Sequence, residues 1–137
     1  MPDRGAAHGY SGKPLAHKLG IRPGMTVLTI GAPAHYHDLV PKTDDVRWRV
    51  RAKVADLVHL FCSDRKALNT RLESALGKVA DGGMLWVSWP KKSSPLFKDL
   101  TEDDLREVIL PTGFVDVKVC AVDKDWSGLK FLRRKSR

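Results

Sequence analysis

The chain has 137 residues, of which 42% are hydrophobic and 29% are charged, and its formal net charge at pH 7 is +8. This length and composition fit one globular domain and exclude a fibrous repeat or a disordered chain. No apolar run approaches the roughly 18 residues that cross a membrane, and the N-terminal stretch MPDRGAAHGYSGK lacks the apolar core of a secretory signal. We therefore expect a cytoplasmic protein with no membrane partner. We expect a single domain over 1–137, with flexible ends at 1–12 and 135–137.

Apolar runs and turn residues predict the elements of the first half of the chain. A short helix over 15–19 stops at Gly20, and a buried strand over 25–30 follows the Pro23-Gly24 turn. Residues 32–40 are irregular, with at most two helical turns. An alternating strand over 46–50 then precedes a near-continuous apolar run over 54–62, which is typical of a central strand.

The second half begins with the clearest helix. Apolar residues recur at helical spacing over 64–79, and Ser63 or Asp64 is available as the N-cap. A strand over 84–89 follows. A second helix starts at Thr101 and buries a stripe of Leu105, Val108 and Ile109, and strands over 114–122 and 128–134 form a terminal hairpin.

Strands that alternate with helices predict an α/β fold: a three-layer, Rossmann-like, mostly parallel sheet with a C-terminal antiparallel hairpin. Ligands of such sheets bind at the carboxyl edge of the parallel strands. Lysines, hydroxyls and free amides gather in the loops there, which favours an anionic ligand. The candidate ligand-binding residues are Gly31, Ala32, His35, Ser63, Asp64, Lys91, Lys92 and Ser93.

Positive charge is spread over both halves of the chain, with two local concentrations. Basic residues crowd the C-terminus from Lys130 onward, and four others alternate with apolar residues along the predicted strand over 46–50 and beyond it. A solvated face and a phosphate-binding face are both compatible with the second pattern. The candidate nucleic-acid residues are Arg47, Arg49, Arg51 and Lys53.

The order of motifs resembles two families. The string LGIRPGMTVLTIG, the strand VADLVHLF, the segment VADGGMLWVSWP and the hairpin VDVKVCAVDKDWSGLKF resemble the skeleton of class I S-adenosylmethionine-dependent methyltransferases. That likeness implies a cofactor at the loop after the first strand. A more extensive likeness, through WVSWPKK and DWSGLKF, is to small bacterial proteins that form a domain family of unknown function, and it implies no activity.

Three features depart from the methyltransferase pattern. The first loop, GAPAH at 31–35, holds one glycine where that family has three, and Pro33 offers no backbone N–H. The strand over 46–50 leads into Arg51 and Lys53, where the family has an acid that accepts the ribose hydroxyls. Only three residues separate this strand from the next, fewer than a parallel crossover needs. We therefore expect an antiparallel edge strand or an irregular segment, and an abbreviated adenosine pocket.

These departures predict a noncatalytic or regulatory binding module that recognises an anionic small molecule or a protein. This interpretation assigns no catalytic residue, no metal site and no cofactor, and it disfavours S-adenosylmethionine. One alternative is an S-adenosylmethionine-dependent methyltransferase, and a second is a nucleic-acid binder acting through Arg47 to Lys53. His59 is interpreted as a core histidine, and Cys62 and Cys120 as reduced thiols.

Overall fold

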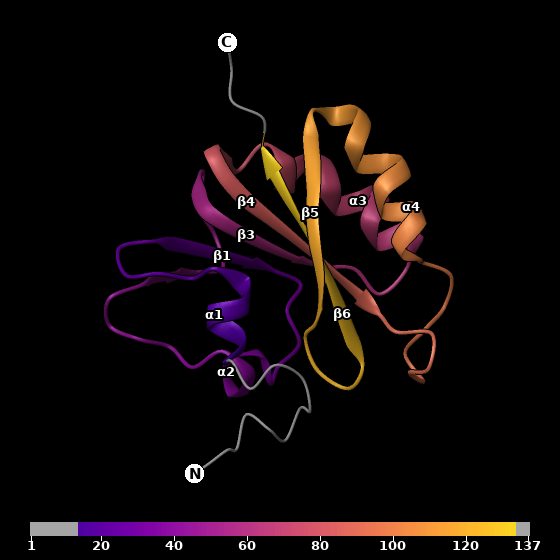
Figure 1. Ribbon diagram of the computed structural model, residues 1–137, viewed down its shortest axis with the longest axis horizontal. Coiled ribbons are helices and arrows are strands. Elements are labelled where there is room, and N and C mark those ends of the chain that lie inside the picture. Colours follow the sequence, from indigo (N-terminus) through magenta and orange to yellow (C-terminus); the bar gives the residue numbers. More distant parts are fainter. Residues whose placement is uncertain (1–13, 134–137) are drawn as a thin grey trace.

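The computed structural model describes residues 14–133 and forms a six-stranded mixed sheet with helices on both faces (Figure 1). The predicted ends at 1–12 and 135–137, and most of the basic C-terminus, lie outside the described residues. The elements are α1 (Leu15–Leu19), β1 (Thr26–Ile30), α2 (Tyr36–Leu39), β2 (Arg47–Arg49), β3 (Ala55–Phe61), α3 (Arg65–Leu76), β4 (Val79–Pro90), α4 (Glu102–Ile109), the 3-10 turn η2 (Leu110–Thr112), β5 (Phe114–Ala121) and β6 (Trp126–Arg133).

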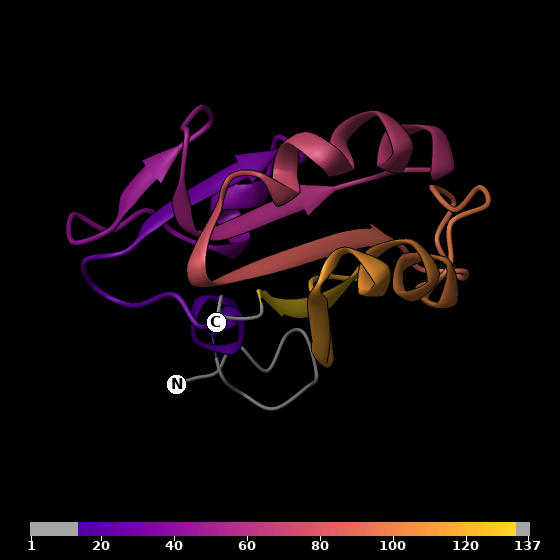
Figure 2. The same cartoon turned by 90° about the horizontal axis from the view of Figure 1, so that it is seen from above.

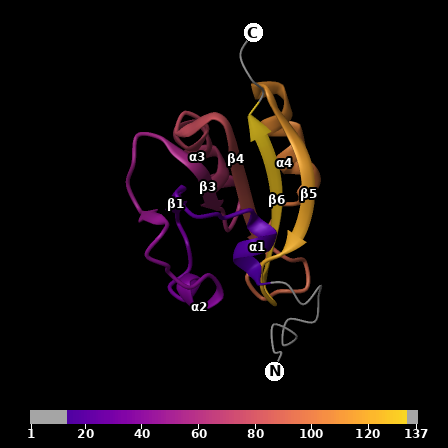
Figure 3. The same cartoon turned by 60° about the vertical axis from the view of Figure 1, so that its left-hand side comes forward.

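The strand order is β2-β1-β3-β4-β6-β5. The first four strands in this order are parallel, and β6 pairs antiparallel with both β4 and β5. Figure 3 shows the hairpin along one margin of the sheet, with β1 toward the opposite margin. This arrangement confirms the predicted Rossmann-like sheet, its C-terminal hairpin and its abbreviated half.

Two apolar clusters sandwich the sheet because successive strand residues point to opposite faces. On β3, Val58 and Leu60 pack with α3 and α4, whereas Leu57 and Phe61 pack with α1 and α2. Figure 2 shows α3 and α4 lying over the strands. The larger helices therefore cover one face, and the other depends on two short helices and their loops.

The expectation of an antiparallel edge strand was wrong, because β2 runs parallel to β1, with Arg47 opposite Thr26 and Arg49 opposite Leu28. The connection over 50–54 reaches β3 on the far side of β1 without a helix. Five extended residues suffice because β2 is short and neighbouring strands lie only about 4.8 Å apart. Ala52 of this connection packs against the same cluster as α3, so the crossover passes over the α3 face of β1.

Two boundaries differ from the sequence prediction by three residues or more, and one predicted core residue is exposed. Helix α3 ends at Leu76 rather than 79, and β4 begins at Val79 rather than 84, because Val79 already pairs with Ala55 across a register shift. Thr101 caps α4 as predicted, in a capping box with Asp104. Val108, assigned to the buried stripe of α4, is instead 38% exposed. No helix within 14–133 has the length and apolar character needed to cross a bilayer.

A buried polar chain crosses the core beneath α2. The Tyr36 hydroxyl lies 3.0 Å from Nδ1 of His59, and Nε2 of His59 lies 2.7 Å from the Ser88 hydroxyl. All three side chains are buried, so the interpretation of His59 as a core histidine is confirmed. Burial lowers the pKa of His59 from 6.5 to about 3, so the imidazole stays neutral and its two nitrogens hydrogen-bond the flanking hydroxyls. Both cysteines are free thiols.

Acid should therefore destabilise the protein through His59. Below pH 6.5 the unfolded chain binds a proton that the folded chain does not accept until about pH 3, so this contribution to stability is complete above pH 6.5 and falls by up to about 1.4 kcal/mol per pH unit below it. Urea unfolding between pH 7 and 4.5 should show a shallower pH slope for His59→Gln than for the wild type. His17→Gln, at an exposed histidine, is the control, and equal slopes for all three proteins would contradict the assignment.

Candidate functional site

The carboxyl ends of β1 and β3 mark the point where the chain changes direction across the sheet. From β1 the chain runs to β2 on one side, and from β2 it crosses to β3 on the other. The loops that leave β1 and β3 therefore diverge, and open α/β sheets bind their ligands at such a point.

The loop after β1 exposes backbone donors. Gly31 has a φ of 71°, a left-handed conformation that glycine adopts without steric cost. Within residues 14–133 the N–H groups of Ala32 and Ala34 donate no hydrogen bond. The sequence prediction of an abbreviated pocket rested partly on this loop having one glycine where the methyltransferase pattern has three. In the structure the remaining glycine turns the chain, and these two amides of the described residues have no hydrogen-bond partner.

Arg71 of α3 lies directly against Gly31. Its Nη1 donates to the carbonyl of Phe61 at 2.7 Å, and a Cβ at position 31 would collide with this guanidinium while standing 3.1 Å from the same carbonyl. Sequence reasoning missed Arg71. A signal was present, because Arg71 interrupts the buried stripe formed by Leu68, Leu72 and Ala75.

His35 and Asp123 form a pair at the same edge. Nε2 of His35 lies 2.9 Å from Oδ2 of Asp123, while Oδ1 accepts the backbone N–H groups of Asp125 and Trp126 at 2.8 Å each. Burial acts to raise the pKa of Asp123, but the hydrogen bonds from His35 and the two amides lower it below its ordinary value. The carboxylate is thus ionised, so Nε2 of His35 must donate. The half-exposed imidazole keeps Nδ1 for other partners.

An aromatic cluster supports this edge from below. The ring of Phe61 contacts Tyr36 and Trp126 edge-on, with centroids 5.7 Å and 5.1 Å apart, and stacks on His59. Tyr36, Phe61 and Trp126 are buried. Because Tyr36 follows His35 and Trp126 closes the turn that contains Asp123, the cluster fixes the spacing of the pair.

Asp64, another predicted ligand residue, caps helix α3. Oδ1 of Asp64 accepts from the N–H of Ala67 at 2.8 Å as the N-cap of α3, and Oδ2 lies 3.6 Å from Nζ of Lys98. The amide of Ala67, followed by the Lys98 charge, lowers the pKa of Asp64. Ser63 beside it is exposed. Asp64 therefore serves the helix first.

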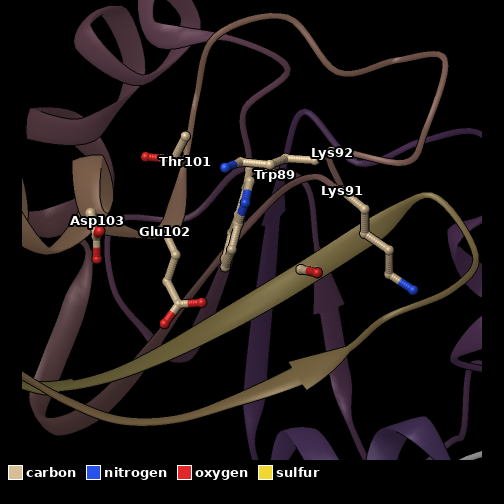
Figure 4. Close-up of a pocket in the computed structure, with 7 residues that line it drawn as sticks. Trp89, Lys91, Lys92, Thr101, Glu102 and Asp103 are labelled. Atoms are coloured by element: carbon tan, nitrogen blue, oxygen red, sulfur yellow. The ribbon is translucent and has the colours of Figure 1, made fainter.

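Lys91 and Lys92 line a separate pocket of about 390 Å³, with Trp89, Glu102 and Asp103 among its other walls (Figure 4). The two carboxylates from α4 place negative charge beside the lysines, and Ser93 is not among the lining residues. Figure 4 shows Lys91 pointing away from Glu102. The structure therefore does not gather the predicted anion-binding residues into one site.

The sequence predicted that the four basic residues of the nucleic-acid alternative share one strand face. In the structure they do not. Strand β2 ends at Arg49, and Arg47 donates to Thr26 Oγ1 at 3.0 Å and to the carbonyl of Gly24 at 3.1 Å. Arg51 and Lys53 instead line a groove of about 560 Å³ between the connection and α3, which we call the basic groove. Its other walls include Leu28, Ile30 and Lys78. Among residues 14–133, no group of three or more His, Cys, Asp or Glu side chains could hold a metal ion.

Solved structures of known proteins share this fold. A SAM-dependent methyltransferase from Aquifex aeolicus matches with a TM-score of 0.61 at 13% identity, over 95% of this chain and 93% of that protein. The fibrillarin pre-rRNA processing protein of Methanococcus jannaschii matches with a TM-score of 0.57 at 12% identity, over 90% and 74%. A Burkholderia thailandensis 1,6-didemethyltoxoflavin-N1-methyltransferase, solved with S-adenosylhomocysteine bound, gives 0.56 at 15%, over 88% and 75%.

No family model matches the chain, and a search of curated proteins finds no match. The likeness to the bacterial family with WVSWPKK and DWSGLKF stays a prediction. The preference for a noncatalytic or regulatory module was wrong, because SAM-dependent methyltransferases recur among the solved structures with this fold. At 12–15% identity these structures show a shared fold.

Substituting Gly31 tests the packing of the loop against Arg71. Gly31→Ala and Gly24→Ala both force alanine into a left-handed conformation, since φ is 71° and 88°, at roughly 1–2 kcal/mol each. At position 24 nothing lies within 4 Å of the new Cβ, whereas at 31 the Cβ would displace the flexible end of Arg71 and should add about 1 kcal/mol. Chemical denaturation should show the larger loss for Gly31→Ala, and a background of Arg71→Ala should recover most of the excess. Equal losses at both glycines would contradict this packing.

Proposed function

We propose that this chain binds S-adenosylmethionine at the loop after β1 and transfers its methyl group to an acceptor. The observation that carries the proposal is the left-handed Gly31 with the unbonded amides of Ala32 and Ala34, at the switch point of a sheet shared with methyltransferases. Backbone donors at that point are suited to the polar end of such a cofactor. Among the fold matches, a magnesium protoporphyrin IX methyltransferase was solved with bound SAM, and the Burkholderia enzyme with S-adenosylhomocysteine.

The residues fit one half of the cofactor better than the other. The Gly31 loop and the Arg71 guanidinium supply donors for the methionine moiety. At the end of β2, Arg49 stands where the resemblance leads one to expect an acid for the ribose hydroxyls. The ribose hydroxyls would therefore need other acceptors.

When bound, S-adenosylmethionine supplies an electrophilic methyl group on a sulfonium centre. His35, in the loop after β1, would take the proton of the acceptor. Its Nε2–H is held by the ionised Asp123, so Nδ1 is the nitrogen that would accept the proton. The aromatic cluster holds the pair in place and keeps water from below.

Calorimetry with the full chain tests the proposal. Titration of S-adenosylmethionine, and separately of S-adenosylhomocysteine, should give saturable one-to-one binding, and Gly31→Ala should weaken it at least about tenfold, or 1.4 kcal/mol. Lys92→Ala, in the separate pocket, is the matched control and should bind like the wild type. Absence of saturable heat for both ligands at millimolar concentration would refute the proposed function.

A further inference from the structure

Arg71 is a charged residue in an apolar position. Its neighbours at helical spacing, Leu68, Leu72 and Ala75, are buried against the sheet, and Arg71 itself is half-buried. A guanidinium on this side of a helix carries a desolvation cost that an exposed one does not. The fold therefore holds this cation at the ends of β1 and β3 rather than releasing it to solvent.

The guanidinium has unused hydrogen-bonding capacity. An arginine carries five N–H donors, and within residues 14–133 Arg71 gives one hydrogen bond, to the carbonyl of Phe61, and makes no ion pair. Asp64 is the acid whose charge acts on Cys62, as that of Arg71 does. Its carboxylate already caps α3 and lies near Lys98. The remaining donors of Arg71 are thus free for a ligand.

A thiolate partner is also excluded. Cys62 follows Phe61, and burial raises the pKa of its thiol to about 12, a larger effect than the opposing charge of Arg71. The thiol stays protonated at neutral pH and supplies no negative charge. The described part of the chain therefore leaves the guanidinium without an anion.

The glycine loop brings this cation next to free backbone donors. Only the missing side chain at position 31 allows the guanidinium to lie there, and the amides of Ala32 and Ala34 follow at once in the chain. A planar fork and neighbouring amides are complementary to a carboxylate, which accepts two parallel hydrogen bonds.

We propose that Arg71 recognises the α-carboxylate of the methionine moiety and so determines which adenosyl sulfonium compounds bind. This inference rests on the proposed function, because the ligand is the one proposed there. It assigns the carboxylate contact to a residue of α3 whose side chain touches both β3 and the loop after β1.

Calorimetry with a ligand pair tests the inference. The wild type should bind S-adenosylmethionine at least about tenfold more tightly than decarboxylated S-adenosylmethionine, since charge-assisted bidentate contacts carry roughly 10–100-fold in affinity. Arg71→Gln should lose that preference by weakening S-adenosylmethionine alone, and Arg71→Lys should keep part of it. Arg65→Gln removes the same charge from the exposed start of the same helix and should retain the wild-type preference.

The following outcomes would contradict the inference. Equal affinity of the wild type for the two ligands contradicts it even if Arg71→Gln fails to fold, and so does an equal loss for both ligands in Arg71→Gln. Tighter binding by Arg71→Gln would mean that the guanidinium obstructs the site. If the wild type binds neither ligand, the proposed function fails as well, and this result is distinct from binding that ignores the carboxylate.

Discussion

The contact between the Arg71 guanidinium and Gly31 is the constraint on which the carboxyl edge of the sheet depends. The hydrogen bond from Arg71 to Phe61 ties α3 to the end of β3, and the bare Cα of Gly31 lets the same side chain reach the end of β1. Two parallel strands and one helix are thus joined at the switch point. A Cβ at position 31 would force the Arg71 guanidinium to shift away from the loop whose amides face the proposed ligand.

The other half of the site follows from the short connection over 50–54. Five residues take the place of the helix that links most parallel strands, so the α3 face of β1 is left partly open as the basic groove. Arg49 ends β2, and Arg51 and Lys53 enter that groove, in the stretch where the resemblance leads one to expect an acid. Under the proposed function, the methionine end of the site therefore keeps donors suited to the cofactor, whereas the ribose end carries positive charge in place of an acid.

Regular elements were predictable because short-range periodicity decides them. The buried stripe of α3, the Thr101 cap and the hairpin depend on residues a few positions apart. The site depends on contacts between distant segments, such as His35 with Asp123, 88 positions away. The number of glycines in the loop does not reveal the left-handed conformation of Gly31. A charged residue such as Arg71 is normally expected on the exposed face of a helix, so its place beside the buried stripe was not predicted. The direction of β2 was misjudged because crossover length was judged against helical connections.

Amide chemical-shift mapping tests most directly the proposal that the loop after β1 binds S-adenosylmethionine. A ¹⁵N-labelled full chain titrated with S-adenosylhomocysteine should show its largest shifts at Gly31, Ala32, Ala34 and His35, because their N–H groups lie at the proposed contact. Shifts centred on the Lys91 and Lys92 pocket or on the basic groove, or no shifts at millimolar ligand, would contradict the account.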